Sequence, residues 1–190
     1  MDEEKKARAN AKNLDSKILK EFSDAEKKFV STLNDGRLGK GKFKLQIVSF
    51  KNGDEEFGVD IMRVQEIIRI QTITKVPQMP GYIEGIINLR GNVIPVIDLR
   101  KKFELQTQEF TDQTRIIVVN INSRTVGFIV DSVHEVLRLG DEHIGPPPEI
   151  IAGISRKYIS GVGKIENRLI ILLDLNQILS EKDNSELGNI

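Results

Sequence analysis

The side chains best suited to recognition chemistry in this 190-residue chain are Glu66 and Arg90. Arg90 stands in Asn88-Leu89-Arg90-Gly91-Asn92, a pattern that predicts a tight turn between two apolar strands, with a positive φ at Gly91. An arginine on a rigid turn presents a planar fork of donors that suits a carboxylate or exposed backbone carbonyls of a partner. Arg90 could instead only hold its own turn. Glu66 could instead only pair with an arginine of its sheet, such as Arg69.

Apolar residues close to these two in the sequence could form a patch around them. A central interface anchor is typically worth about 2 kcal/mol or more, against less than about 1 kcal/mol for a charge at the rim. A binding site here would therefore depend on apolar neighbours as well as on the charges. The residues expected to bind a partner are Val64, Glu66, Ile67, Ile86, Asn88, Arg90, Gly91 and Val93.

Residue types that carry catalysis or bind metals are scarce in the chain. It has no cysteine and only two histidines, His134 and His143, so a zinc site is not expected. Adjacent acids at 54–56 and 141–142 are typical of solvated turns. No serine lies in a nucleophile-elbow motif, and no glycine-rich phosphate-binding motif follows a strand-like run. We therefore expect a binding protein and not an enzyme, with no cofactor and no metal.

The overall charge restricts the kinds of partner. The chain has 28 basic and 28 acidic residues, and its formal net charge of zero provides no field for binding nucleic acid or an anionic membrane surface. No segment approaches the roughly 18 apolar residues of a membrane span, and the N-terminus lacks a signal-peptide-like run. We expect a cytoplasmic protein without direct membrane insertion. A nucleic-acid-binding barrel and an enzyme with an unrecognised site are the alternative hypotheses.

The elements that position these side chains belong to a pattern that occurs twice. The first run below returns 69 positions later and the other two return 76 positions later: 64–70 as 133–139, 82–86 as 158–162, and 96–99 as 172–175. Matching residue types in matching order predict two similar lobes packed against each other. The copies differ at Asn88-Leu89-Arg90-Gly91, where the second has Lys164-Ile165-Glu166-Asn167. Both copies would share a motif that the scaffold needs, so the unshared turn is a candidate for function.

Short Ile- and Val-rich runs separated by Gly, Asn, Asp or Pro predict a mainly β protein. Short helices are expected at 98–103 and 174–179, where Asp98 and Asp174 can act as N-caps. Many short strands with few helices favour two small closed barrels over a parallel sheet. Pro77, Pro80 and Pro95 are expected at an edge or a corner of a sheet. The expected strands are 43–50, 56–61, 66–71, 84–90, 92–97, 114–121, 124–131, 133–139, 159–166 and 168–173.

The first 41 residues follow a different pattern. Apolar residues recur there every three or four positions, as on one face of an amphipathic helix, at Leu14, Ile18, Phe22, Ala25, Phe29 and Leu33. We expect residues 1–41 to be a helical, partly flexible extension that either docks on its own domain or binds a partner. The main domain is expected at 42–182, with a tail at 183–190.

Motifs along the main domain occur in an order that points to a family. They are Phe57-Gly58-Val59-Asp60-Ile61, Val64-Gln65-Glu66-Ile67, Gly85-Ile86-Ile87-Asn88-Leu89-Arg90-Gly91, Pro95-Val96-Ile97-Asp98-Leu99, Val130-Asp131-Ser132-Val133, Tyr158-Ile159-Ser160-Gly161 and Leu172-Leu173-Asp174. Over roughly 42–182 the chain resembles the CheW family, the coupling proteins of bacterial chemotaxis. Its helical extension is longer than the short N-terminus usual in that family.

The resemblance implies a non-enzymatic cytoplasmic adaptor made of two small SH3-like β-barrels packed together. It would join methyl-accepting chemotaxis receptors, through their cytoplasmic hairpin tip, to the regulatory domain of the histidine kinase CheA in membrane receptor arrays. Other CheW copies are further expected neighbours in rings. The family's coupling glutamate and arginine correspond to Glu66 and Arg90.

Overall fold

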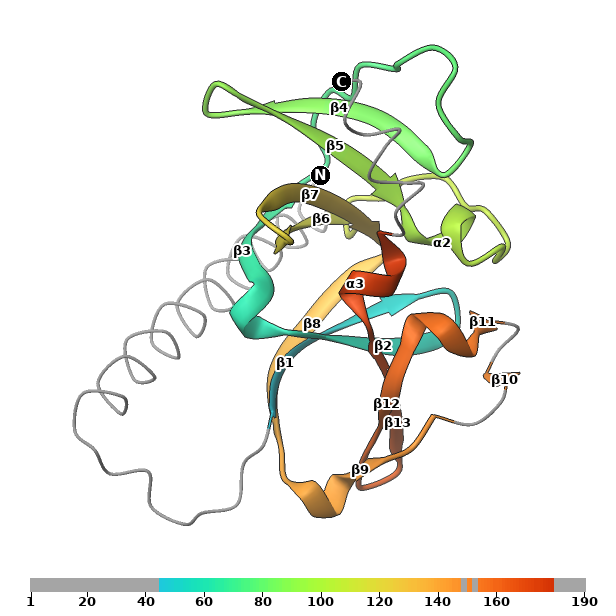
Figure 1. Cartoon of the computed structure of the whole chain (residues 1–190). Helices are drawn as coiled ribbons and strands as arrows, with labels where there is room; N and C mark the ends of the chain where they lie inside the picture. Colours follow the sequence, from blue (N-terminus) through green and yellow to red (C-terminus); the bar gives the residue numbers. More distant parts are fainter. Residues whose placement is uncertain (1–44, 148–149, 152–153, 180–190) are drawn as a thin grey trace, which may run out of the picture.

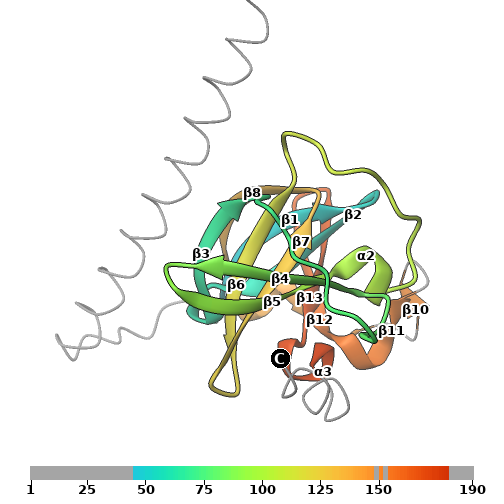
Figure 2. The ribbon, with the colours of Figure 1, turned by 90° about the horizontal axis from the view of Figure 1, so that it is seen from above.

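The computed structural model describes residues 45–147, 150–151 and 154–179. These residues form a six-stranded and a five-stranded mixed sheet together with a two-stranded ribbon. Figure 1 shows the five-stranded sheet above the six-stranded one, and Figure 2, seen from above, shows their strands overlying one another. The prediction of a mainly β protein is confirmed. The expected helical extension at 1–41 and the tail at 183–190 lie outside the described residues.

The six-stranded sheet has the order β8-β1-β2-β13-β12-β9. Its strands are β1 (Leu45–Asn52), β2 (Glu55–Asp60), β8 (Ser132–Leu139), β9 (Ile144–Gly145), β12 (Ile159–Ile165) and β13 (Arg168–Leu173). The five-stranded sheet has the order β3-β6-β7-β5-β4. Its strands are β3 (Val64–Arg69), β4 (Ile83–Leu89), β5 (Asn92–Asp98), β6 (Arg115–Ile121) and β7 (Arg124–Val130). The ribbon pairs β10 (Ile150–Ile151) with β11 (Ile154–Ser155).

Each expected strand is present within a few residues of its predicted bounds, and so are both short helices, α2 (Leu99–Lys102) and α3 (Leu175–Ile178). Their predicted N-caps are confirmed. The Asp98 carboxylate accepts a hydrogen bond from the Arg100 backbone N–H at 2.8 Å, and the Asp174 carboxylate accepts one from the Asn176 N–H at 3.0 Å. Sequence reasoning missed the short strands β9 to β11 and the three 3₁₀ turns η1 (Ile61–Arg63), η2 (Asp141–His143) and η3 (Arg156–Tyr158).

The two sequence copies do not each build one sheet, which corrects the expectation of one lobe per copy. Strands β1 and β2 of the first copy lie in the six-stranded sheet with β8, β12 and β13 of the second. Strands β6 and β7 of the second copy lie with β3, β4 and β5 of the first. Both sheets use the same pairing, because β2 runs parallel to β13 and β7 runs parallel to β5. The copies have therefore exchanged their first two strands.

The chain links the two edges of each sheet. After β3, which forms one edge of the five-stranded order, the chain crosses to β4 at the other edge, where Thr74 bridges Ile86. The two backbone hydrogen bonds of this bridge measure 2.9 and 2.8 Å. In the six-stranded sheet, β8 continues through η2 into β9, which pairs with β12 at Val162 and Gly145. Each sheet therefore curls so that its two edges are joined by the chain, β3 to β4 in the five-stranded sheet and β8 to β9 in the six-stranded sheet.

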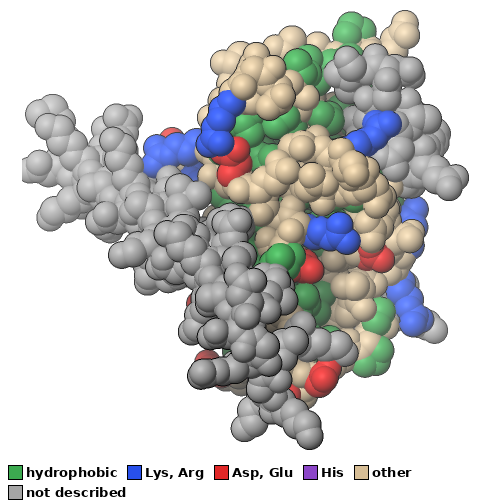
Figure 3. Space-filling view, turned by 60° about the vertical axis from the view of Figure 1, so that its left-hand side comes forward, with side chains coloured by type: hydrophobic (Ala, Val, Ile, Leu, Met, Phe, Trp, Pro, Cys, Tyr) green, Lys and Arg blue, Asp and Glu red, His purple; other side chains and the backbone are tan. Residues whose placement is uncertain are grey.

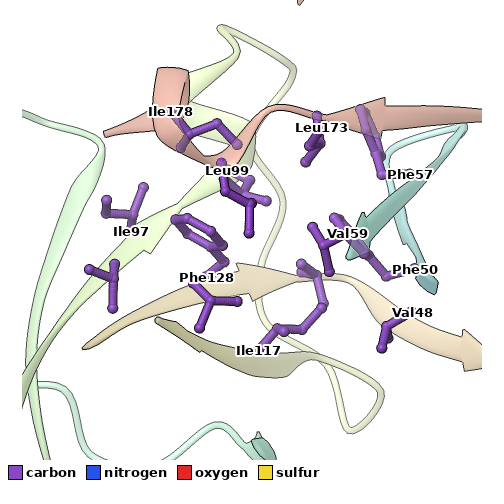
Figure 4. Packing of buried hydrophobic residues seen from close by; sticks show 14 of the residues in the cluster. Val48, Phe50, Phe57, Val59, Ile97, Leu99, Ile117, Phe128, Leu173 and Ile178 are labelled. Carbon is purple, nitrogen blue, oxygen red and sulfur yellow. The ribbon is translucent and has the colours of Figure 1, made fainter. Parts of the chain in front are cut away.

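Strands with unbroken apolar runs are buried on both faces. In β6, Ile117 and Val119 belong to a large core shared by both sheets, whereas Ile116 and Val118 belong to a smaller core of the five-stranded sheet. Side chains alternate in the same way along β13 between the shared core and a third cluster in the six-stranded sheet. Figure 4 shows the shared core, to which both sheets and α3 contribute. Period-two alternation thus divides one apolar run between two cores.

Pro95 lies within β5, between β4 and β7 in the strand order, but at a position where only β4 is its partner, so the predicted edge position holds locally. It is opposite Ile86 on β4, and pairing with β7 begins only at Val96. Because hydrogen-bonded and non-hydrogen-bonded pairs alternate from the two-residue turn of this hairpin, Pro95 falls at a non-hydrogen-bonded position. The ladder therefore loses no donor at this proline.

Candidate functional site

Arg90 lies at the tip of the hairpin that joins β4 to β5. Leu89 pairs with Asn92, which leaves Arg90 and Gly91 as a two-residue loop with φ values of 54° and 89°. Positive φ at both central residues is the type I′ geometry that matches the twist of a hairpin. The Asn88 side-chain oxygen accepts a hydrogen bond from the Gly91 N–H at 2.9 Å. The predicted turn and the positive φ at Gly91 are confirmed, whereas the positive φ at Arg90 was not predicted.

The Arg90 guanidinium forms an ion pair with Glu66 on β3. Its Nη2 lies 3.0 Å from Oε2 of Glu66, and the side chains are 78% and 21% exposed, respectively. Glu66 thus pairs with an arginine on a turn 24 residues away along the chain. The pair holds the guanidinium in one orientation while most of its surface stays open to solvent.

A pocket of about 420 Å³ lies beside this ion pair. The pocket is lined by residues of β3, of the β4–β5 hairpin and of β7: Gln65, Glu66, Leu89, Arg90, Asn92, Val93, Ile94 and Thr125. Gln65 and Asn92 stand inside the motifs that drew attention to Glu66 and Arg90, so their position was a signal that sequence reasoning did not use. Thr125 comes from the second copy, and no local pattern connects it with Arg90.

The four apolar residues of the expected patch differ in burial. Val64 is buried in the shared core, and Ile67 packs against that core. Ile86 is half-buried beside the Thr74 bridge, whereas Val93 is exposed at the pocket. Val93 is therefore the member that presents an apolar surface next to Arg90, and Val64 supports the strand that carries Glu66.

The second copy keeps the acidic strand residue but pairs it differently. Glu135, the counterpart of Glu66, lies 2.7 Å from Nη1 of Arg168, and the other side of that guanidinium binds Glu56 at 3.1 and 2.5 Å. Burial raises the pKa of Glu56, but the Arg168 hydrogen bond and charge outweigh it and lower that pKa overall. The counterpart of Arg90 is Glu166, which also has a positive φ of 51°. The turn geometry is shared, and the arginine at its tip is not.

The face of the molecule in Figure 3 shows basic and acidic side chains singly or in pairs among small apolar areas. Such a surface has no extended field of one sign, in line with the zero net charge. In the part of the chain that the structure describes, no cluster of His, Asp or Glu could hold a metal ion. Among those residues, no helix is long and apolar enough to cross a bilayer. The exposed Arg90 guanidinium, oriented by Glu66, has the donor geometry to bind a carboxylate or carbonyl group of a partner.

Comparisons with known proteins decide the family. The CheW-like domain model matches residues 46–183. The chain belongs to the CheW family. The chemotaxis protein CheW of Klebsiella aerogenes is 38% identical over 145 residues, which cover 76% of this chain and 87% of the relative. CheW of Bacillus subtilis is 39% identical over 140 residues, which cover 74% and 88%.

Solved structures agree with this assignment. The match is the crystal structure of the scaffolding protein TtCheW from Thermoanaerobacter tengcongensis, whose sequence is 39% identical to this one. The TM-score is 0.69, and the match covers 73% of this chain and 94% of the TtCheW chain. The chain is thus a chemotaxis scaffolding and coupling protein of the CheW family, which is non-enzymatic. The resemblance predicted from the sequence motifs is confirmed, and the matched residues include the whole Glu66–Arg90 pocket.

Proposed function

We propose that this CheW-family protein couples methyl-accepting chemoreceptors to the histidine kinase CheA, and that it does so in the cytoplasm at membrane receptor arrays. The observation that carries the proposal is the Arg90 guanidinium, which stands exposed at the tip of a strained turn and is oriented by Glu66. A family member that scaffolds chemotaxis needs such fixed polar anchors, because it performs no chemistry of its own.

The residues proposed to contact partners fall into two groups by exposure. Asn88, Arg90, Gly91 and Val93 are exposed at one hairpin, where they can touch another protein directly. Glu66, Ile67 and Ile86 are half-buried beside it, and Val64 is buried beneath β3. In this proposal the first group makes the contact and the second holds the hairpin and β3 in register.

Coupling by an adaptor requires contacts that differ in free energy between signalling states, and such terms are typically about 1–3 kcal/mol. Two sheets that share one core form a stiff unit, so a contact made on one sheet is held in a defined place relative to a contact on the other. Binding of receptor and kinase to the same adaptor also raises the effective concentration of each for the other. Neighbouring CheW copies would extend such contacts into rings.

We infer further that each sheet is the wall of a small SH3-like barrel within a domain at 42–182. In each sheet the chain leaves the strand at one edge, β3 or β8, and continues to the opposite edge, and this connection supports the inference. Residues 1–41 are proposed to be a helical extension, and 183–190 a tail. Deletion of residues 1–38 should leave the melting temperature nearly unchanged if the extension is an arm for a partner. A fall of many degrees would show that it packs on the domain.

Co-sedimentation tests the proposed coupling. Receptor-containing membranes are mixed with CheA, with and without the full chain, and the kinase in the pellet is measured. We expect CheA to sediment with the membranes in proportion to the added chain until the receptor sites are filled. Sedimentation of CheA to the same extent without the chain, or failure of the chain itself to sediment, would contradict the proposal.

A further inference from the structure

A second pocket lies at the end of the five-stranded sheet away from the Arg90 turn. It has a volume of about 520 Å³, within the roughly 300–1,000 Å³ of small-ligand sites. Its walls come from the start of β4, the end of β5, helix α2 and the loop that follows α2: Glu84, Asp98, Lys101, Thr107, Gln108, Glu109 and Phe110. It shares no residue with the pocket at Glu66 and Arg90.

The inner wall of this pocket holds two carboxylates and one ammonium. The side chains of Glu84 and Asp98 are only 13% and 7% exposed. The Lys101 ammonium pairs closely with Glu84 and lies 4.0 Å from Oδ2 of Asp98. Lys75 reaches Glu84 only at 3.9 Å and is exposed, so solvent screens its charge. Glu109 adds a further acidic group. Among the residues that line the pocket, Glu84, Asp98 and Glu109 are acidic and Lys101 is basic, and only Glu84 and Asp98 are shielded from solvent.

The pKa of the Asp98 carboxyl group is shifted by this environment. Burial raises its pKa, backbone hydrogen bonds from Lys101 and Arg100 and the Lys101 charge act against that rise, and the charge of Glu84 adds to it. The net shift is upward. Burial is the largest cause, so the surroundings stabilise the charged form of this carboxylate less than water does. A cation that entered the pocket would stabilise that charged form.

The outer wall carries an exposed phenylalanine on a loop that is held at both sides. Before Phe110, the buried Arg100 guanidinium donates to the Gln106 carbonyl at 2.5 Å and to the Gln108 side-chain oxygen at 3.0 Å. After it, the Thr111 N–H donates to the Thr114 hydroxyl at 2.8 Å. These hydrogen bonds restrict the loop that carries Phe110, so a partner that binds to its ring would cost less conformational entropy.

The other copy shows that the scaffold does not need these charges. The positions 76 residues later are Ser160 for Glu84, Asp174 for Asp98 and Gln177 for Lys101. Only the aspartate is shared, and in both copies it caps the following helix. The Glu84–Lys101 pair therefore belongs to one copy alone, as the Arg90 turn does.

We propose that this pocket is a docking site for an arginine side chain on a protein partner. A guanidinium carries a positive charge, and its planar fork can bind the oxygens of two neighbouring carboxylates. It can also stack on the exposed ring of Phe110, as cations do on aromatic faces. The site goes beyond the proposed receptor and kinase coupling and depends on none of the residues assigned to it.

Nuclear magnetic resonance titration of the ¹⁵N-labelled full chain tests the proposal with three blocked tripeptides, Gly-Arg-Gly, Gly-Lys-Gly and Gly-citrulline-Gly. Citrulline keeps the shape of arginine without its charge. We expect saturable shifts around Lys101, Gln108 and Phe110, strongest with the arginine peptide and absent with the citrulline peptide. Glu84→Gln should weaken arginine binding about tenfold, because it removes a charged acceptor and leaves Lys101 to neutralise Asp98.

Phe110→Leu, which keeps an apolar side chain at a 43% exposed position, should weaken binding severalfold, and the exposed remote variant Glu142→Gln should not change it. Equal shifts with citrulline, shifts centred on Arg90, or unchanged affinity in both pocket variants would overturn the proposal. Spermidine serves as a separate probe. If it bound more tightly than the arginine peptide at the same resonances, the pocket would be a small-cation site and the protein-docking proposal would be wrong.

Discussion

Replacing Arg90 by glycine and by alanine separates its role in binding from its role in the fold. The backbone at this position has φ 54°, and a residue with a side chain in that region costs about 1–2 kcal/mol. The ion pair with Glu66 is worth less than about 1 kcal/mol, because the Arg90 side chain is 78% exposed. Arg90→Gly loses the pair and relieves the strain. Its free energy of unfolding should therefore stay within about 1 kcal/mol of wild type.

Arg90→Ala loses the ion pair and keeps the strained turn, so it should be the less stable of the two variants. The difference is expected to be about 1 kcal/mol, or about 2–4 °C in melting temperature for a protein of this size. Both variants lack the guanidinium. If Arg90 is a central anchor worth about 2 kcal/mol, both should bind the receptor–kinase assembly roughly thirtyfold more weakly.

Urea unfolding and calorimetry measure the stabilities, and co-sedimentation at graded concentrations of the chain measures the binding. Arg156→Ala, which removes an exposed arginine from η3, is the matched control and should leave both quantities unchanged. A loss of more than about 2 kcal/mol of unfolding free energy in Arg90→Gly would mean that the arginine holds the fold. Wild-type binding by both variants would refute the assignment of the site.

Three further predictions concern the scaffold. Arg100→Ala should lower the unfolding free energy by about 3–5 kcal/mol in urea, because it strands the carboxylate that its buried guanidinium binds, and a loss below 1 kcal/mol would contradict this. Arg168→Ala should lower the free energy of unfolding by about 1–3 kcal/mol at pH 7. This loss should shrink as pH falls below 4.5, the ordinary pKa of Glu56, and through the lower pKa of Glu56 in the folded protein. A loss that does not change with pH would count against the lowered pKa. Gly127→Ala should cost about 1–3 kcal/mol, because its Cβ would lie 2.7 Å from an isoleucine methyl, whereas Gly81→Ala has open space and should be near neutral; equal melting temperatures would contradict the close packing.

Features that depend on neighbours along the chain were predictable. Unbroken or alternating apolar runs between turn residues identified the strands of both sheets, because a β-strand hydrogen-bonds and buries side chains with a short, regular period. Asp98 and Asp174 identified the two helix starts, because capping needs only the next two or three residues. The Asn88–Gly91 turn was predictable for the same reason. At its tip the positive φ of Arg90 was missed, because only the two-residue loop length requires it.

Features that depend on pairing between distant segments were not predictable. The internal repeat indicated two alike halves, but not that each sheet takes its first two strands from the other copy. Repeated residue types are equally compatible with pairing inside one copy or across the two. The place of Pro95 within a strand that has neighbours on both sides was not predictable for the same reason, since it depends on where the pairing with β7 begins.

The sequence by itself determined the family, the strands, the helix caps and the turn that carries Arg90, because each of these is recorded in residues that are close along the chain. Only the tertiary structure decided that Glu66 pairs with Arg90, that Thr125 joins their pocket, and that Glu84, Lys101 and Phe110 line a second one. These contacts arise where the sheets curl and the copies exchange strands. Their geometry depends on which strands pair, and many pairings are compatible with the same local pattern.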